Sequence, residues 1–428
     1  MNLKDQFTNL LQNKKILLGV TGSISVYKAL ELTRLFIKAG AEVKVVMSQS
    51  AKKFVTPLSF EVLTSNRVLD DTNECWVSDH NHIKTTSWAD VFVIAPATAN
   101  TIAKLANAIA DNMLLQCALA FENSKIIAPA ANTKMLANPI TQANIKMLNI
   151  SSYTFVETQN KELACKEVGD GALAEPLDIF YTTARELLKD EYWVNRRVVV
   201  SGGGTIEKID EVRYLSNFSS GKMANNLALS LYLRGADVNL ISTKLSPELP
   251  TNMHHIEVQS SEEMQEYIKD SIRIAKKGIL TKATLVGDSH PELIRKEPYL
   301  FMVAAVSDYI PKFSQSGKLK KETLGNEWSL ELKQNIDILN SLDKTDIKTI
   351  AFKAEMDIST AKMDATNILE KKKVDAVCLN ILEDSSSFGT TQNSIELITK
   401  NSSTKFEKMD KLPLSLKIVD SLKGTYSE

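Results

Sequence analysis

Short apolar runs, separated by stretches of helical periodicity, make up most of this chain. A continuous apolar run of about four to eight residues is typical of a strand buried on both faces of a parallel sheet. Runs of this kind predict strands at 15–20, 43–47, 91–95 and 125–128, and again at 198–200, 238–241, 301–306, 349–352 and 375–379. Because these strands alternate with helical segments, the pattern predicts an α/β fold.

Helical periodicity marks the segments between the runs. In the first of them, Ala29, Leu32 and Phe36 share one face, and Gly40 is well placed to end the helix because a left-handed cap suits glycine. His82 precedes the strand predicted at 91–95 and is expected in a loop. Further predicted helices span 101–120, 224–234, 262–277 and 412–422.

The two halves of the chain share one arrangement. A helix end that turns into a second strand occurs at Lys38–Val46 and again at Arg234–Ile241. This echo favours tandem copies of a dinucleotide-type fold over a short-period solenoid. We therefore predict two doubly wound, Rossmann-like domains, the first over 1–189 and the second over 190–428.

The composition is that of an ordinary globular protein, with 43% hydrophobic and 24% charged residues and a net charge of −1. Such a charge gives no general attraction to nucleic acid or to an anionic membrane. The start of the chain lacks a signal-peptide core, and no apolar run approaches the roughly 20 residues that span a bilayer. The 4 scattered cysteines argue against a disulfide framework or a zinc site, so a reducing cytoplasm is expected.

The stretch from Val198 to Met223 is the most informative part of the sequence. It begins as a buried strand, breaks into Gly202–Gly204, and ends in Ser219–Lys222 immediately before a predicted helix. The backbone N–H groups of such a turn and the positive end of the helix dipole favour negatively charged ligands. The stretch therefore predicts a phosphate-binding site in the second half.

Two strands of the first half end in a proline, small residues and an asparagine, at Pro96–Asn100 and at Pro129–Asn132. The carboxyl ends of parallel strands meet at one edge of a sheet, so this repetition suggests a flat slot suited to a planar ring system. Two ordinary strand-to-helix loops explain the pattern equally well.

Thr21–Ser23, after the first strand, is explained as well by a plain tight turn. Cys165 lies in a polar loop, where an inert thiol is the simpler interpretation.

Three features of the second half indicate a polyphosphate ligand. Asp308, at the end of a buried strand, could hold Mg²⁺ or a ribose hydroxyl. The lysines within 318–321 and 371–373 could neutralise phosphate charge. Either lysine cluster alone is better explained as a solvated surface. Their presence in the half that carries Ser219–Lys222 favours binding.

With these residues assembled, the chain resembles the bacterial bifunctional coenzyme A biosynthesis flavoproteins, which join a phosphopantothenoylcysteine decarboxylase to a phosphopantothenate–cysteine ligase. The resemblance covers nearly the whole chain in the same order. Val212–Met223 and Ala304–Tyr309, with the lysine loop, look like the ligase signature. His82–Asp90, Ala95–Asn100 and Pro129–Met135 look like the flavin-dependent decarboxylase signature.

For the first half, the resemblance implies FMN-dependent decarboxylation of 4'-phosphopantothenoylcysteine. In the family, the flavin oxidises the cysteinyl group to a thioaldehyde, which acts as an electron sink when CO₂ leaves. The resemblance implies that His82 is the base, that Asn132 holds the substrate carboxylate and that Cys165 donates a proton. The implied FMN-binding positions are Gly22, Ser23, Ser48, Thr98 and Asn100.

For the second half, the resemblance implies ligation of cysteine to 4'-phosphopantothenate with CTP and Mg²⁺. The carboxylate displaces pyrophosphate to give an acyl-cytidylate, and cysteine then displaces CMP. Positive charge near the α-phosphate stabilises this chemistry. Lys318 matches the essential lysine, Asn217 matches a residue that contacts the acyl intermediate, and Arg213 is expected to support the Asn217 loop. The implied CTP-binding positions are Ala304, Asp308, Lys318, Phe352 and Lys372, with the metal near Asp308.

Several residues depart from the family pattern, and they leave one alternative open. The changes around Cys165 allow an active ligase whose flavin-binding first half is inactive or regulatory. The attached ligase half argues against a relative that decarboxylates a peptide or prenylates flavin. The departures are Ala131 in place of a methionine, Lys166–Glu167 and Ala172–Leu173 around Cys165, Ile368 in place of a CTP-binding lysine for which Lys371 could substitute, and an insertion at 278–299.

The resemblance also implies a homo-oligomer that acts on small molecules. In the family, the decarboxylase halves trimerise and place FMN at a subunit boundary, whereas the ligase halves dimerise. No nucleic-acid or membrane partner is expected.

Overall fold

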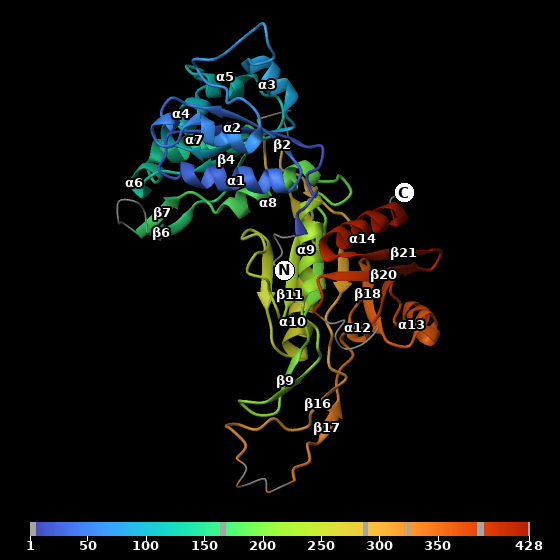
Figure 1. Cartoon of the computed structure of the whole chain (residues 1–428). Helices are drawn as coiled ribbons and strands as arrows, with labels where there is room; N and C mark the ends of the chain where they lie inside the picture. The colour runs from blue at the N-terminus through green and yellow to red at the C-terminus, as the bar shows by residue number, and fades with distance from the viewer. Residues whose placement is uncertain are drawn as a thin grey trace. The chain divides into compact units, whose positions relative to one another are not determined.

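The computed structural model describes residues 6–162, 168–285, 290–320, 322, 325, 327–382 and 389–426 (Figure 1). Contacts divide the chain into two compact units. The first unit comprises Phe7–Lys189 together with Leu280–Glu292. The second comprises Asp190–Ile279 and Leu293–Glu428, with the segment that ends at Gln6. Both units are α/β, so the predicted fold class is confirmed. Among the described residues, no helix is long and apolar enough to cross a membrane.

The first unit is built on a parallel sheet of order β2-β1-β3-β4-β5. This is the flavodoxin-like order, in which the direction of winding reverses between β1 and β3. Ligands of this fold bind outside the carboxyl ends of the strands at that switch point. The strands are β1 (Lys15–Val20), β2 (Glu42–Met47), β3 (Val91–Ala97), β4 (Lys125–Pro129) and β5 (Tyr153–Phe155).

Helices cover both faces of this sheet. On one side α1 packs against α2 and α8, and on the other α4 packs against α5 and α7 (Figure 1). A hairpin, β6–β7, follows the sheet. The bounds are α1 (Val26–Lys38), α2 (Pro57–Thr64), α3 (His82–Trp88), α4 (Ala99–Ala106), α5 (Met113–Ala120), α6 (Thr133–Leu136), α7 (Pro139–Ile150), α8 (Pro176–Leu188), β6 (Gln159–Glu162) and β7 (Val168–Ala172).

Aromatic packing in the core of the first unit explains a glycine inside a buried strand. Phe92 and Phe121 meet edge to face, with ring centroids 5.8 Å apart. A Cβ on Gly19 would lie 2.9 Å from the Phe92 ring, so only glycine leaves room for it. Burial of each such large side chain contributes about 1.5–3 kcal/mol.

The second unit is built on an eight-stranded sheet of order β12-β11-β8-β15-β18-β19-β20-β21. The first six strands are parallel and follow the doubly wound order 3-2-1-4-5-6, with the switch point between β8 and β15. The last two strands are antiparallel. The bounds are β8 (Arg197–Gly202), β11 (Asp237–Ser242), β12 (His254–Glu257), β15 (Tyr299–Met302), β18 (Lys348–Glu355), β19 (Ala376–Ile381), β20 (Gln392–Thr399) and β21 (Ser403–Asp410).

Helices also cover both faces of the second sheet. Helix α9 packs on β8 and β11 and against α14, whereas α10, α12 and α13 contribute to the core on the other face. Short two-stranded pairs extend beyond the sheet (Figure 1). The bounds are α9 (Lys222–Leu233), α10 (Ser261–Ala275), α12 (Ile338–Ser341), α13 (Ile358–Lys371), α14 (Lys411–Tyr426), β9 (Ile206–Lys208), β10 (Tyr214–Ser216), β13 (Ile279–Leu280), β14 (Leu293–Ile294), β16 (Tyr309–Pro311) and β17 (Leu332–Gln334).

Several secondary-structure predictions differ from the structure. The strand predicted over 301–306 ends at Met302, and the short strands β5 and β12 were not predicted. The helix predicted over 101–120 is two helices, because Ala108 adopts a left-handed conformation and the Asn112 side chain accepts a hydrogen bond from the N–H of Leu115, which starts α5 anew. His82 begins α3 instead of lying in a loop, because Asn81 caps that helix. Strand β21 was not predicted. Phe406 is the one buried residue of this strand, and its other residues have the polar pattern of a loop.

Candidate active sites

A cavity of about 510 Å³ lies beside the turn after β1 and the loop after β4. It brings together Ser23 and Asn132, which follow two different strands, whereas Pro96–Asn100, the other segment of the predicted slot, does not line it. The β6–β7 hairpin supplies the opposite wall. The lining residues are Ser23, Ile24, Ser25, Tyr27, Lys28, Ala130, Ala131, Asn132, Lys161, Glu162, Gly171, Ala172 and Leu173.

Four other predicted FMN positions lie in the segments that follow β1, β2 and β3 and do not line this cavity. The Thr21 hydroxyl donates to the carbonyl of Pro96 (2.6 Å) and accepts from the N–H of Thr98 (3.1 Å), which ties the turns after β1 and β3 together. A Cβ on Gly22 would lie 2.5 Å from the Cβ of Ser50, so the close approach of these loops requires glycine. The four positions are Gly22, Ser48, Thr98 and Asn100.

The loop that carries Asn132 is pressed against the β6–β7 hairpin. The Asn132 side chain accepts a hydrogen bond from the N–H of Lys134 (2.9 Å) and caps α6. The N–H of Ala131 donates to the carbonyl of Gly171 (3.1 Å). A Cβ on Gly171, whose φ is +145°, would lie 2.3 Å from the Ala131 oxygen. The hairpin therefore sets the position of Asn132. Cys165 lies outside the described residues.

A buried lysine connects α1 to this hairpin. Lys28, which is 6% exposed, donates to the carbonyl of Leu173 (3.2 Å) and to Glu175 Oε1 (2.9 Å). Lys161 of β6 donates to the same carboxylate oxygen (2.9 Å). Burial lowers the pKa of Lys28, and Lys161 lowers it further. Burial raises the pKa of Glu175, but hydrogen bonds from Lys161 and Lys28 outweigh it and leave that pKa below its ordinary value.

His82 is held by a carboxylate that the sequence did not single out. Its Nδ1 lies 2.6 Å from Glu74 Oε1, and its backbone N–H donates to the same oxygen (3.3 Å). The Trp76 ring meets the imidazole edge to face, with centroids 5.6 Å apart. Because a carboxylate accepts, Nδ1 carries the proton and Nε2 is the basic atom. His82 does not line the cavity that contains Asn132.

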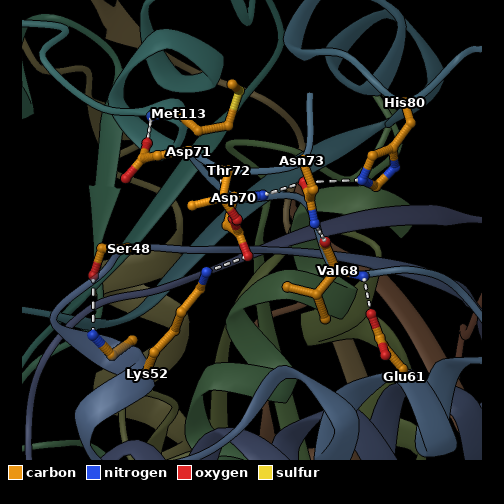
Figure 2. A network of polar contacts seen from close by, with 11 residues as sticks. Ser48, Lys52, Glu61, Val68, Asp70, Asp71, Thr72, Asn73, His80 and Met113 are labelled. Atoms are coloured by element: carbon orange, nitrogen blue, oxygen red, sulfur yellow. Dashed lines mark hydrogen bonds and ion pairs between the residues drawn. The ribbon is translucent and has the colours of Figure 1, made fainter. Parts of the chain in front are cut away.

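The loop that leads to Glu74 is fixed by a polar network around buried Asp70 (Figure 2). The Asp70 carboxylate accepts from the N–H (2.8 Å) and hydroxyl (2.6 Å) of Thr72 and pairs with Lys52. Burial raises the pKa of Asp70, but these contacts outweigh it and hold that pKa below its ordinary value. Asn73 Oδ1 accepts from the N–H of Asp70 (3.0 Å) and contacts His80 Nε2 (3.2 Å).

In the second unit, a cavity of about 180 Å³ lies at the switch point between β8 and β15. It contains the serine-rich start of α9 and two of the predicted nucleotide positions, Ala304 and Phe352. The predicted phosphate turn and two of the predicted CTP-binding positions therefore line one cavity. The lining residues are Gly203, Ser219, Ser220, Gly221, Met223, Ala224, Val303, Ala304, Ala305, Phe352, Lys353, Ala354, Asn380, Leu382, Gly389, Asn393, Ile395 and Lys411.

Backbone contacts place Asn217 beside this cavity. The Asn217 side chain donates to the carbonyl of Ala305 (3.3 Å), which also accepts from the N–H of Thr205 (3.2 Å). Gly203 has a φ of +78°, and a Cβ there would lie 2.1 Å from the hydroxyl of Thr243. Only glycine allows the turn after β8 to pack this closely.

Arg213 binds the lysine loop. Its guanidinium donates to the carbonyl of Leu319 (2.8 Å), next to Lys318, and lies 3.8 Å from the carboxylate of Asp210. Arg213 therefore supports the loop around Lys318, and its expected support of the Asn217 loop stays a prediction. Lys318 itself is exposed and does not line the cavity.

The remaining predicted nucleotide positions lie outside the cavity lining. Lys372 forms an ion pair with Asp337 (3.0 Å), and Asp308 is exposed at the start of β16. Ile368 packs against the apolar core, where a lysine head group would be desolvated. Among the described residues, no group of three or more His, Cys, Asp or Glu side chains could hold a metal ion.

The lining residues that the sequence analysis missed include two with buried polar groups. The buried side-chain oxygen of Asn380, at the end of β19, has no hydrogen-bond partner among the described residues. Lys411 is buried at the start of α14. Asn380 follows an apolar run, as other predicted site residues do, so its position at a strand end was a usable signal. Lys411 carries no such signal.

Family models match both units. The Flavoprotein family model matches residues 6–188, and the model of the DNA/pantothenate metabolism flavoprotein C-terminal domain matches 193–298 and 288–425. The second match is in two pieces that overlap within 288–298, next to the predicted insertion.

Curated relatives match along almost the whole chain. The coenzyme A biosynthesis bifunctional protein CoaBC of Bacillus subtilis is 35% identical over 419 residues, which cover 96% of this chain and 97% of the relative. The CoaBC protein of Haemophilus influenzae is 32% identical, with 98% and 99% covered. A solved structure of a PPC decarboxylase mutant complexed with pantothenoylaminoethenethiol is 33% identical, covers 40% of this chain and 97% of its own, and has a TM-score of 0.37.

Proposed function

Because the chain belongs to the family of coenzyme A biosynthesis bifunctional proteins, we propose that it carries out two consecutive reactions. The second unit ligates cysteine to 4'-phosphopantothenate with CTP, through an acyl-cytidylate. The first unit then decarboxylates 4'-phosphopantothenoylcysteine to 4'-phosphopantetheine with FMN. The observation that carries this proposal is a cavity next to the carboxyl ends of the strands in each sheet.

The first-unit cavity fits FMN and a substrate carboxylate. Its lining includes the small residues Ala130 and Ala131 after β4, which suit a flat ring, and the hydroxyl and amide groups of Ser23 and Asn132. When bound, FMN supplies the oxidation and reduction of the cysteinyl carbon and sulfur. The lining contributes Ser23 toward the flavin and Asn132 toward the carboxylate. Gly22, Ser48, Thr98 and Asn100 complete the flavin site in this proposal.

His82 acts as the base through Nε2. Glu74 accepts from Nδ1, which fixes the tautomer and stabilises the imidazolium that forms when Nε2 takes a proton. Because His82 lies outside the cavity of its own unit, a trimer in which it faces the flavin of a neighbouring subunit is the arrangement that completes the site. Cys165 is proposed as the proton donor.

The second-unit cavity fits a nucleotide polyphosphate. The serine-rich turn before α9 offers backbone N–H groups and the positive helix end to the phosphates. Lys318 supplies positive charge near the α-phosphate, Asn217 contacts the acyl intermediate, and Mg²⁺ is held with the phosphates near Asp308. Ala304 and Phe352 contact the nucleoside. In this proposal, Lys372 binds CTP only after its ion pair with Asp337 is broken.

Exposed aromatic residues on or next to the two-stranded pairs β9–β10 and β16–β17 support dimerisation through the second unit. Tyr214 on β10 is 57% exposed, and Tyr309 and Phe313 near β16 are 59% and 69% exposed. Side chains of this size and exposure, gathered on neighbouring hairpins, are typical of a surface that a partner covers. A second copy of the chain is the proposed partner. A cytoplasmic setting is proposed from the cysteine usage.

A second candidate function follows from the residues around Cys165. Ala172 and Leu173 replace the usual residues of the hairpin, which supports a flavin-binding unit without decarboxylase activity next to an active ligase. Against this, the backbone of that segment keeps its contacts with Lys28 and with the Asn132 loop.

A coupled assay tests both functions. The purified protein should be yellow, and with CTP, phosphopantothenate and cysteine it should release pyrophosphate and then CO₂. Release of pyrophosphate without CO₂ would favour the second candidate. Lys318→Ala should abolish pyrophosphate release while decarboxylation of added phosphopantothenoylcysteine continues. Loss of both activities in a folded, yellow variant would contradict two separate sites.

A further inference from the structure

The second-unit cavity contains a buried lysine that none of the reactions above uses. Lys411, the first residue of α14, is 5% exposed and lines the cavity beside Ser220 and Gly389. Its ammonium donates to the carbonyl of Thr390. Among the described residues, no carboxylate forms an ion pair with Lys411. Buried lysines are usually paired, because desolvating an isolated charge is costly.

A second amine lies next to the first. Lys222, at the start of α9, donates to the carbonyl of Gly389 (2.5 Å), the residue before Thr390. Burial, and to a smaller extent the neighbouring charge of Lys222, lower the pKa of Lys411 to about 8. The other groups on adjoining elements are the carboxyl of Asp410, at the end of β21, and the neutral amide of Asn393 on β20. The two amines therefore lie close to each other, with Lys411 buried in the cavity lining and Lys222 half-buried beside it.

We propose that Lys411 and Lys222 form an anion-binding pair that holds a phosphate of the nucleotide in the second-unit cavity. The proposal rests on the proposed CTP-dependent ligation. A phosphate would supply the negative charge that the pair lacks, and it would lie at the positive end of α9, whose serine-rich start lines the same cavity. The nucleoside base has no comparable charge.

Affinity for the nucleotide is the first measurement. CTP with Mg²⁺ is titrated into the full-length protein by calorimetry, without phosphopantothenate or cysteine, so no turnover occurs. Lys411→Gln should weaken CTP binding roughly 10- to 100-fold, because a charge-assisted hydrogen bond is lost. Lys411→Arg should retain most of the affinity. Lys417→Gln, at an exposed position on the same helix, is the matched control and should bind CTP like the wild type.

Proton uptake is the second measurement, and a lysine with a purely structural role would not produce it. At pH 8, Lys411 is partly deprotonated, so a bound phosphate should draw a proton onto it. Titrations in buffers of different ionisation enthalpy should show uptake of up to about half a proton with CTP and none with cytidine. Lys411→Arg should abolish the uptake while CTP still binds.

The outcomes separate this proposal from the function on which it rests. CTP binding without proton uptake, or uptake that persists in Lys411→Arg, would overturn the role of Lys411 and leave the ligation intact. Wild-type affinity in Lys411→Gln would do the same. Absence of CTP binding by the wild type would overturn both. If Lys411→Gln fails to fold, the Lys411→Arg comparison still decides.

Discussion

The carboxylate of Asp210 accepts a hydrogen bond from the backbone N–H of Leu319, 109 residues later in the chain, at 3.1 Å. The same carboxylate accepts from the N–H groups of Val212 and Arg213, and the Arg213 side chain donates back to the carbonyl of Leu319. Burial raises the pKa of Asp210, but these backbone hydrogen bonds outweigh it and hold that pKa below its ordinary value. Asp210 therefore stays ionised and fixes the loop that carries Lys318.

Asp210→Asn should lower the ligation rate about 10-fold or more, because the amide replaces a charged acceptor and the Lys318 loop loses its fixed position. Decarboxylation should not change, because it takes place in the other unit. The measurement is pyrophosphate release against CO₂ release from added phosphopantothenoylcysteine. Glu211→Gln, at the exposed neighbouring position, should behave like the wild type. Equal loss of ligation in both variants would refute a specific role of Asp210.

Glu74→Gln should reduce decarboxylation by about 10-fold or more, because the neutral amide no longer stabilises the protonated His82 ring. Glu74→Asp should restore part of the rate. Flavin absorbance and pyrophosphate release should stay at wild-type levels, since neither depends on the charge of Glu74. A Glu74→Gln variant with full decarboxylase activity would show that decarboxylation does not require a carboxylate at His82 Nδ1.

Glu175→Gln should destabilise the first unit by about 1–2 kcal/mol, because the partly exposed carboxylate partners both Lys28 and Lys161. The pKa of Glu175 is lowered in the folded state, so its contribution is present above about pH 4.5 and is lost as the pH falls through the folded-state value. Urea unfolding followed by flavin fluorescence at pH 7 and at pH 3.5 would measure this. Exposed Glu157→Gln is the control. A destabilisation by Glu175→Gln that is larger at pH 3.5 than at pH 7 would contradict this prediction.

Gly171→Ala should displace the β6–β7 hairpin, because the new Cβ would meet the Ala131 oxygen in a backbone conformation that L residues rarely adopt. The strain is worth about 1–3 kcal/mol, enough to lower decarboxylation severalfold or more. Gly424→Ala, in the second unit, has open space around it and should leave both activities unchanged. Unchanged decarboxylation in a yellow Gly171→Ala protein would mean that the hairpin does not set the position of Asn132.

Asn380→Leu should stabilise the second unit slightly, or leave its stability unchanged, because it removes a buried polar atom without a partner. The same change should weaken CTP binding roughly 10-fold if that amide contacts the nucleotide. Chemical unfolding and calorimetry on the same preparation would test both effects. Loss of stability with unchanged CTP affinity would assign Asn380 to the fold instead of the site.

From the sequence alone, the apolar runs predicted β1 to β4 of the first sheet and β8, β11, β15, β18 and β19 of the second, because strands buried on both faces of a parallel sheet tolerate few polar residues. The short strands β5 and β12 lack such runs and were missed. Glycine and asparagine at the strand ends predicted the positions of the two candidate sites. Hydrophobic periodicity predicted helix boundaries less well where a polar capping residue sets the start of a helix. Asn112 divides one predicted helix into two, and Asn81 starts a helix at His82. Strand β21 has almost no apolar face, so no period could reveal it.

Only the tertiary structure decided which of the predicted residues meet. It joined Ser23 to Asn132 and Ala304 to Phe352, but it left His82, Lys318 and Lys372 outside those cavities. It also supplied Glu74, Glu175, Asp210 and Lys411, whose partners lie in other loops or elements of the fold. Sequence periodicity records the burial of each residue with its near neighbours. A charged side chain's partner is set by where loops from different strands end in space, and the linear pattern does not carry that information.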